Sequence, residues 1–383
     1  MSTQSETRTA AVAASGWGFP VRFFQPGNPA FWVYVLLVGA GAFIYYGIVE
    51  GASDYPTGTI LALALCVVYT LPFVWFITRR DRYEREPAKL AILGFLWGGL
   101  AASWVMASPA NGAILSIYSK LFGVDFASTW GPALTAPLTE ETSKYVGLIL
   151  LFLLARNHVR SAYDGLLLGA FTGLGFQVFE NFSYMTNAVE NNFGASQAHD
   201  VLFIFLMRGV TGIVSHWMFS AIAGTGLGYF IGAKNRSLGH RFAVAAGFML
   251  LAMVAHGSMD AMMAVGLIGL LLAWILGIGG IVFAFRFANR RQRTWMGALL
   301  ADEVANGTIT KEELTVLEGP RKTKKRYLAS IRKEKGKQAA RNAALVLEAQ
   351  TDLAARIAAT DDPFGPEANA ARAEVARLRA LPA

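Results

Sequence analysis

The sequence has few charged side chains and a single cysteine. Only 16% of its 383 residues are charged and 54% are hydrophobic, whereas soluble domains carry about 25% charged residues. This deficit argues against a water-soluble enzyme and against disorder. The lone cysteine, Cys66, excludes an internal disulfide and a cysteine-based zinc site. The first 29 residues lack a continuous apolar stretch, so we expect no cleavable signal peptide.

Long apolar runs are abundant instead. Each is close to the roughly 20 residues that a transmembrane helix needs. The eight runs are Ala30–Val49, Thr57–Thr78, Leu90–Ala107, Gly131–Ala155, Asp164–Ala188, Val201–Ala233, Phe242–Ala264 and Leu267–Ala288. A backbone in lipid must satisfy its own hydrogen bonds, and none of the runs alternates like a barrel strand. We therefore expect an all-α, polytopic helical bundle of about eight spans. The sixth run exceeds one span, and its main helix is expected to begin near Gly209.

The distribution of basic residues predicts the orientation. The loops after even-numbered spans, with the end of the eighth, hold 14 Lys and Arg, and the other loops hold only Lys120. By the positive-inside rule both termini are cytoplasmic. The chain is then an integral protein of the cell membrane with three regions. These are a cytoplasmic N-terminal tail (1–29), an eight-span domain (30–288) and a basic cytoplasmic C-terminal tail (289–383).

The C-terminal tail carries most of the net charge. Arg321–Arg341 holds ten basic residues and one acid. Thr310 and Glu313 fit a capping box that opens a short helix, and Gln338–Ala359 is rich in alanine, so the tail is expected to be partly helical. Either the basic segment binds anionic lipid, or it is a solvated tail that obeys the positive-inside rule. No nucleic-acid partner is expected, because no aromatic residues are interleaved with the basic ones.

A further amphipathic segment lies between the third and fourth spans. Asn111–Phe122 places apolar residues against serines and a lysine, as in a helix that lies in the membrane interface. It would act as a lid or substrate ramp over a membrane-embedded site, or simply pack at the interface.

Ionisable residues inside the spans indicate a functional site. Each costs about 2.5–3.5 kcal/mol at the bilayer centre, so these groups must face one another or a water-filled cavity. They are Glu140, Glu141, Lys144, Glu180, Arg208, His216, His256 and Asp260. Counting the helical rise from the cytoplasmic ends places Glu140, Glu180, both histidines and Asp260 ~21–27 Å from the inner surface. These residues therefore form one polar layer in the outer half of the bilayer. Arg208, near the outer edge, is expected to extend to the interface.

The local spacings assign neighbours within this layer. Glu140 and Lys144 are four residues apart and share a helix face, as do His256 and Asp260. Asp260 is therefore expected to orient the imidazole of His256 or to bind a metal beside it. Two further residues complete the pocket: Phe176, one turn before Glu180, is expected to wall it, and Asn181 to donate a hydrogen bond.

These residues resemble the motifs of the PrsW family of intramembrane proteases. Glu140-Glu141-Thr-Ser-Lys144 is similar to its EExxK motif, Phe176-Gln-Val-Phe-Glu180-Asn181 to FxxxEN, and His256-Gly-Ser-Met-Asp260 to HxxxD. His216 lies where the family has an additional histidine. The likeness spans roughly residues 30–290. The family is distantly similar to the CAAX prenyl proteases, whose second motif ends in histidine where this chain has Glu180.

The resemblance implies a membrane-embedded metalloprotease. Zinc suits imidazole and carboxylate ligands, and we expect it to be held by His216, His256 and Glu180. Glu140 or Glu141 would be the general base. Lys144 would balance the charge of the two glutamates. In a variant of this mechanism no metal binds and the glutamates activate water directly. The resemblance further implies membrane-anchored protein substrates, such as anti-sigma-factor-like regulators.

Two other classes of function remain open from the sequence. Buried carboxylates and histidines also form proton relays in membrane transporters, and a non-catalytic scaffold could retain the same cluster. A zincin-like protease is excluded, because the sequence has no HExxH motif.

Overall fold

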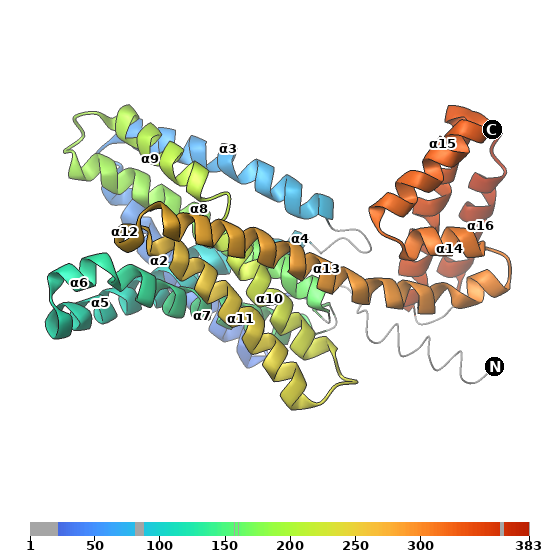
Figure 1. The fold of residues 1–383 in the computed structure, drawn as a ribbon, viewed down its shortest axis with the longest axis horizontal. Helices are drawn as coiled ribbons and strands as arrows, with labels where there is room; N and C mark the ends of the chain where they lie inside the picture. Colours follow the sequence, from blue (N-terminus) through green and yellow to red (C-terminus); the bar gives the residue numbers. More distant parts are fainter. Residues whose placement is uncertain (1–21, 81–87, 157, 160, 361–363, 383) are drawn as a thin grey trace. The chain divides into compact units, whose positions relative to one another are not determined.

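The computed structural model describes residues 22–80, 88–156, 158–159, 161–360 and 364–382. All regular structure within these ranges is helical (Figure 1), which confirms the all-α bundle. The helices are α2 (Pro29–Ala52), α3 (Pro56–Arg80), α4 (Ala88–Leu96), η1 (Trp97–Ala107), α5 (Ser108–Phe122), α6 (Val124–Thr129), α7 (Gly131–Leu154), α8 (Ala162–Asn191), α9 (Gln197–Thr211), α10 (His216–Gly232), α11 (Leu238–Asp260), α12 (Met262–Val265), α13 (Leu267–Ala305), α14 (Lys311–Glu318), α15 (Arg321–Thr360) and α16 (Pro366–Arg379).

Six segments of the described chain are long and apolar enough to cross a membrane. They correspond to predicted spans one, two, three, six, seven and eight. Spans four and five correspond to α7 and α8, which are 24 and 30 residues long. These two helices carry the buried charged residues, so their composition alone does not mark them as spans. The number of eight spans therefore stays a prediction.

The third span is longer than expected. Its helix continues from α4 through η1 into α5, with a π-helical backbone over Trp97–Ala107. The predicted segment Asn111–Phe122 is helical and continues this helix without a break, and its position at the membrane interface stays a prediction. At the start of η1, the indole of Trp97 donates to the carbonyl of Ser143 on α7. The span is thereby held against the helix that carries the EExxK motif.

The sixth apolar run is broken into two helices. α9 ends at Thr211 and α10 begins at His216, so the expectation of one main helix from Gly209 is wrong. Ser215, which precedes α10, has an extended backbone with φ −150° and ψ −154°. At the other end of the break, a side chain on Gly212 would lie 2.2 Å from the Tyr69 hydroxyl. The break therefore depends on a glycine and places His216 at the first position of a helix.

Glycines bring α8 and α10 into close contact. Side chains at Gly165, Gly169 and Gly173 would each lie 2.1 Å from a backbone oxygen of α10. For Gly173 that oxygen belongs to His216. Small residues in membrane helices allow the backbones to approach in this way. The contact fixes the start of α10 against the middle of α8, where Glu180 follows two turns later.

The chain divides into two compact units, of which one is Val21–Arg286 and the other contains Phe287–Ala383. In the second unit, α14 begins with the predicted capping box of Thr310 and Glu313. α15 turns at Gly336, whose φ of 92° favours glycine. Apolar residues of α15 and α16 then form a small core: Val346, Ala349, Val375 and Leu378. The predicted partly helical tail is thus a packed helical unit.

Candidate active site

The predicted site residues converge from four helices. They come from α7 (Glu140, Glu141 and Lys144), α8 (Phe176, Glu180 and Asn181), α10 (His216) and α11 (His256 and Asp260). Beside them lies a cavity of about 390 Å³, lined in part by Glu140, Glu180, His216, His256 and Asp260. This volume is within the range of ligand-binding sites. Residues separated by up to 120 positions therefore share one cavity wall.

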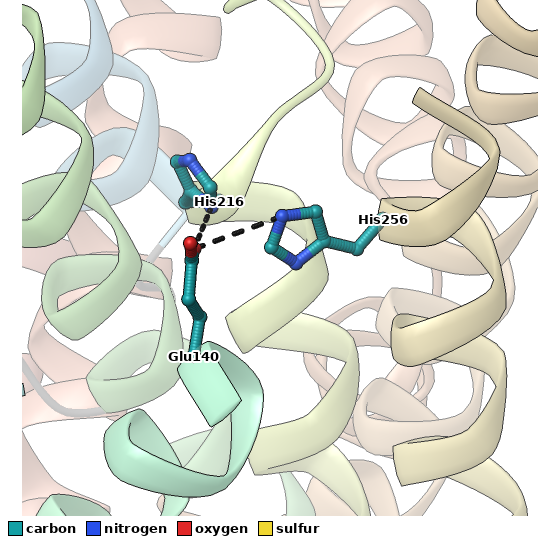
Figure 2. A group of neighbouring side chains, drawn as sticks. All are labelled: Glu140, His216 and His256. Atoms are coloured by element: carbon teal, nitrogen blue, oxygen red, sulfur yellow. Dashed lines mark ion pairs between the residues drawn. The ribbon is translucent and has the colours of Figure 1, made fainter. Parts of the chain in front are cut away.

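Glu140 lies between the two histidines (Figure 2). Its Oε2 atom is 3.8 Å from Nδ1 of His216 and 3.7 Å from Nε2 of His256. One ligand atom from each of these buried residues lies within 4.8 Å of the other two. Oε2 of Glu140 is buried and has no hydrogen-bond partner among the described residues. One carboxylate oxygen and two imidazole nitrogens thus face a common point.

Glu141 is bonded on both oxygens. Oε1 lies 3.0 Å from Nδ1 of His256 and accepts from Nζ of Lys144 at 2.8 Å, while Oε2 accepts from Ser220 at 3.1 Å. The side chain is fully buried. It therefore holds His256 through Nδ1 and leaves Nε2 facing Glu140. Carboxylates that do not bind the metal orient metal-binding histidines in this way.

Glu180 holds the other histidine in the same manner. Its Oε2 lies 3.1 Å from Nε2 of His216, which leaves Nδ1 of that ring toward Glu140. The same oxygen accepts from the guanidinium of Arg208 on α9. Nε of Arg208 donates to Oδ1 of Asn181 at 2.5 Å, and its guanidinium lies 4.0 Å from the ring centroid of Tyr184.

Arg208 therefore turns into the site and does not extend to the interface as expected. The reason is electrostatic: the carboxylate of Glu180 offers a charged acceptor where the interface would offer only water and headgroups. Asn181 accepts this hydrogen bond through its carbonyl oxygen. Arg208 lies on a different helix from every motif, and only its position inside an apolar run marked it as unusual.

Lys144 occupies the centre of the cluster. Its Nζ lies 3.6 Å from Glu140 Oε2 and 3.1 Å from Nδ1 of His216, in addition to its bond to Glu141. It also lies 3.9 Å from the ring centroid of Phe176, and that ring packs against the imidazole of His216. Phe176 thus walls the pocket as predicted from its position one turn before Glu180.

Asp260 lies on the cavity wall beside His256. Its Oδ2 is 3.3 Å from Nε2 of that ring, yet this oxygen is buried and has no hydrogen bond to any described residue. Asp260 therefore contacts the nitrogen that faces Glu140 rather than the nitrogen that Glu141 holds.

The residues present fit a divalent metal. Four carboxylates and two permanent cations, Lys144 and Arg208, lie in one cluster that is buried at Glu140, Glu141 and Lys144 and half-buried elsewhere, which leaves two negative charges when the histidines are neutral. Uncompensated buried charge is costly, and a divalent cation would balance it. The buried oxygen of Glu140 without a partner lies where such an ion would bind. A metal on Nδ1 of His216 would replace the Lys144 contact there, while Lys144 could keep its bond to Glu141.

Two further residues position this cluster, and sequence reasoning missed both: one lies outside the motifs and the other is at a variable position of FxxxEN. Asn111 on α5 donates to Oε1 of Glu140 at 3.2 Å and accepts from the hydroxyl of Thr139. Gln177 on α8 is buried and donates to the Tyr69 hydroxyl and to the carbonyl of Gly212, and it accepts from the amide of Trp217. Their signal in the sequence is weak, because uncharged amides are common in long helices.

Comparison with known proteins gives an independent assignment. A family model described as "PrsW family intramembrane metalloprotease" matches residues 86–301. A protein named Protease PrsW from Geobacillus kaustophilus is 29% identical over 194 residues, covering 47% of this chain and 70% of the relative. A protein of the same name from Clostridioides difficile is 26% identical over 205 residues, covering 51% and 76%. No solved structure matches the chain.

Proposed function

The chain belongs to the PrsW family of intramembrane metalloproteases, and from this premise we propose that it cleaves membrane-anchored proteins at the cavity beside Glu140, His216 and His256. The observation that carries the proposal is the buried Oε2 of Glu140. It has no hydrogen-bond partner among the described residues and lies less than 4 Å from one nitrogen of each imidazole. The family assignment favours a peptidase over a transporter or a scaffold.

The metal ligands in this proposal are Glu140 Oε2, His216 Nδ1 and His256 Nε2. Glu180 and Glu141 then orient the two rings through the opposite nitrogens. Glu180 therefore has an orienting role here, and Glu140 has the ligand role that the sequence first suggested for Glu180. Zinc is the metal that we expect, because three nitrogen and oxygen ligands with an open position suit a catalytic zinc site.

Each remaining group has a role set by its contacts. A bound zinc ion would supply an activated water and polarise the scissile carbonyl. Asp260 would serve as the proton acceptor, since its Oδ2 lines the cavity and has no hydrogen bond to a described residue, with Nε2 of His256 3.3 Å away. Glu141 is unsuited to be the base, because both of its oxygens are occupied. Without a metal, Glu140 would take the role of base.

The substrate is a membrane-anchored protein that presents an extended backbone, because the carbonyls of an intact helix are already hydrogen-bonded. The polar layer is ~21–27 Å from the inner surface of a hydrocarbon core about 30 Å thick. The cut therefore falls at or just outside the outer boundary of a single-span substrate. Anti-sigma-factor-like regulators, which the family resemblance implies, are the substrates that we propose.

The basic tail gives a second contact with the membrane. Lys322, Lys325, Arg326 and Arg332 are exposed on α15, and each basic residue near an anionic surface contributes about 1 kcal/mol. The tail then associates with anionic lipid of the cytoplasmic leaflet. Replacing these four residues with uncharged ones in the full-length protein should weaken the binding of its tail to anionic lipid. The cavity should be unaffected.

Cleavage in reconstituted vesicles tests the proposed function. Wild type and Glu140→Gln are incorporated with a tagged single-span substrate, and the fragments are mapped by mass spectrometry. Glu190→Gln is the matched control, because Glu190 is exposed near the end of α8. Wild type and the control should release one fragment cut near the outer boundary, and Glu140→Gln should release none. Equal cleavage by Glu140→Gln would overturn the site, and a cut in the cytoplasmic third would overturn the orientation.

A further inference from the structure

Two polar groups on the cavity wall have no role in the chemistry described above. Thr135 on α7 is 1% exposed, and its Oγ1 has no hydrogen-bond partner among the described residues. The indole nitrogen of Trp104 on η1 is also buried and without such a partner. Both residues line the cavity that contains Glu140. A buried polar group without a partner destabilises the fold, and a ligand that bonds to it removes that penalty.

Resting on the proposed protease function, we infer that Thr135 and Trp104 form a subsite that binds the backbone of the extended substrate. A peptide backbone offers both a carbonyl acceptor and an amide donor in each residue. The Thr135 hydroxyl can serve either one, and the Trp104 indole can donate to a carbonyl. Neither group carries a charge, so the subsite recognises the main chain rather than an ionised side chain.

The spacing along α7 sets the register of the bound peptide. Thr135 precedes Glu140 by five residues, which is ~7.5 Å along the helix axis. An extended chain rises about 3.3 Å per residue. The backbone group held by Thr135 is therefore about two residues from the scissile bond, on the side where α7 begins.

The walls of this subsite are held by packing. The ring of Trp104 lies 6.0 Å from that of Tyr45, and Tyr45 contacts Phe179 and Phe182 on α8. Two turns of α7 separate Thr135 from the fully buried Ser143, whose carbonyl accepts from Trp97 at the other end of η1. Because η1 and α7 are tied together, the two unpartnered groups keep a fixed relation to Glu140.

Thr135→Val, which keeps the shape and removes the hydroxyl, tests the subsite. Thr172→Val is the matched control: Thr172 is also fully buried with an unpartnered hydroxyl, but it does not line the cavity. Each variant is reconstituted with the single-span substrate, and KM, kcat and the cleavage position are measured. Thr135→Val should raise KM about five- to tenfold, the value of one hydrogen bond, and should add cuts one or two residues from the main one. Thr135→Ser should restore both properties.

An unchanged KM and a single cleavage position in Thr135→Val would overturn the subsite, as would the same change in Thr172→Val. If Thr135→Val does not fold, KM and the cleavage position are measured for Trp104→Phe instead, and the same outcomes decide. The protease proposal is tested separately by Glu140→Gln. Loss of cleavage in that variant with normal behaviour of Thr135→Val would reject the subsite alone.

Discussion

The side-chain amide of Gln177 donates to the carbonyl of Gly212 at 2.9 Å, where the chain leaves one helix to begin another. The same side chain accepts from the amide of Trp217 at 3.3 Å. Helix ends leave carbonyls and amides unpaired, and Gln177 satisfies one of each across the break between α9 and α10. Since His216 lies next to Trp217, a neutral amide on α8 sets the position of a proposed metal ligand on α10.

Replacement of Gln177 by leucine should impair activity and stability together. The change leaves the Gly212 carbonyl and the Trp217 amide without a partner, at about 1–3 kcal/mol for each. We expect kcat to fall at least about tenfold, with a smaller change in KM, because His216 moves while the substrate-binding wall stays. Gln350→Leu is the control: Gln350 is fully buried, but neither of its amide atoms has a partner among the described residues. A normal kcat in Gln177→Leu would contradict the positioning role.

Gly173→Ala should separate α8 from α10. Its added methyl group would lie 2.1 Å from the His216 carbonyl, and a backbone oxygen cannot move aside as a flexible side chain can. We expect lower thermal stability in detergent and strongly reduced cleavage. Gly247→Ala on α11 meets nothing within 4 Å and should be neutral or slightly stabilising. Equal melting temperatures for the two variants would show that the close approach is unimportant.

An acid-sensitive ion pair stabilises the C-terminal unit. Arg372 donates to both oxygens of Glu303, at 2.9 and 2.6 Å. Burial acts to raise the pKa of Glu303, but the hydrogen bonds from Arg372 outweigh it and hold the pKa below its ordinary value. The stabilisation is therefore complete above the ordinary glutamate pKa of about 4.3 and is lost as the pH falls through the lowered value.

Hydrogen exchange of the full-length protein measures this effect. In Glu303→Gln, the amides of α16 should exchange faster at neutral pH, by an amount equivalent to about 1.5–3 kcal/mol. The wild type should approach this rate only in acid. Glu374→Gln removes an exposed pair with Arg377 and should leave the rate unchanged. Protection of α16 that is identical in all three proteins at neutral pH would contradict the prediction.

Reporter fusions test the predicted orientation. The basic residues predict that fusions after Pro56 and Ala195 are extracytoplasmic and that fusions after Arg85 and Arg160 are cytoplasmic. Arg85 and Arg160 lie outside the described residues, so the prediction rests on the sequence. An inverted result at any one of the four positions would also invalidate the depth at which we place the site.

The sequence predicted the helices and the members of the site better than their contacts. Charged residues in apolar runs stand out because lipid excludes them, so Glu140, His216 and His256 could be grouped from depth alone. Which carboxylate faces which imidazole nitrogen depends on helix rotation and on the break at Gly212, and neither follows from spacing. Arg208 was misplaced because its partner, Glu180, lies 28 residues away on another helix.

Metal content is the most direct test of the central claim, that Glu140, His216 and His256 together hold a catalytic metal. Elemental analysis of purified, cleavage-competent protein should give about one zinc per chain. The ratio should fall close to zero in Glu140→Gln and in His256→Gln and stay near one in Glu190→Gln. Full zinc content in Glu140→Gln, or active wild-type protein without metal, would contradict the account.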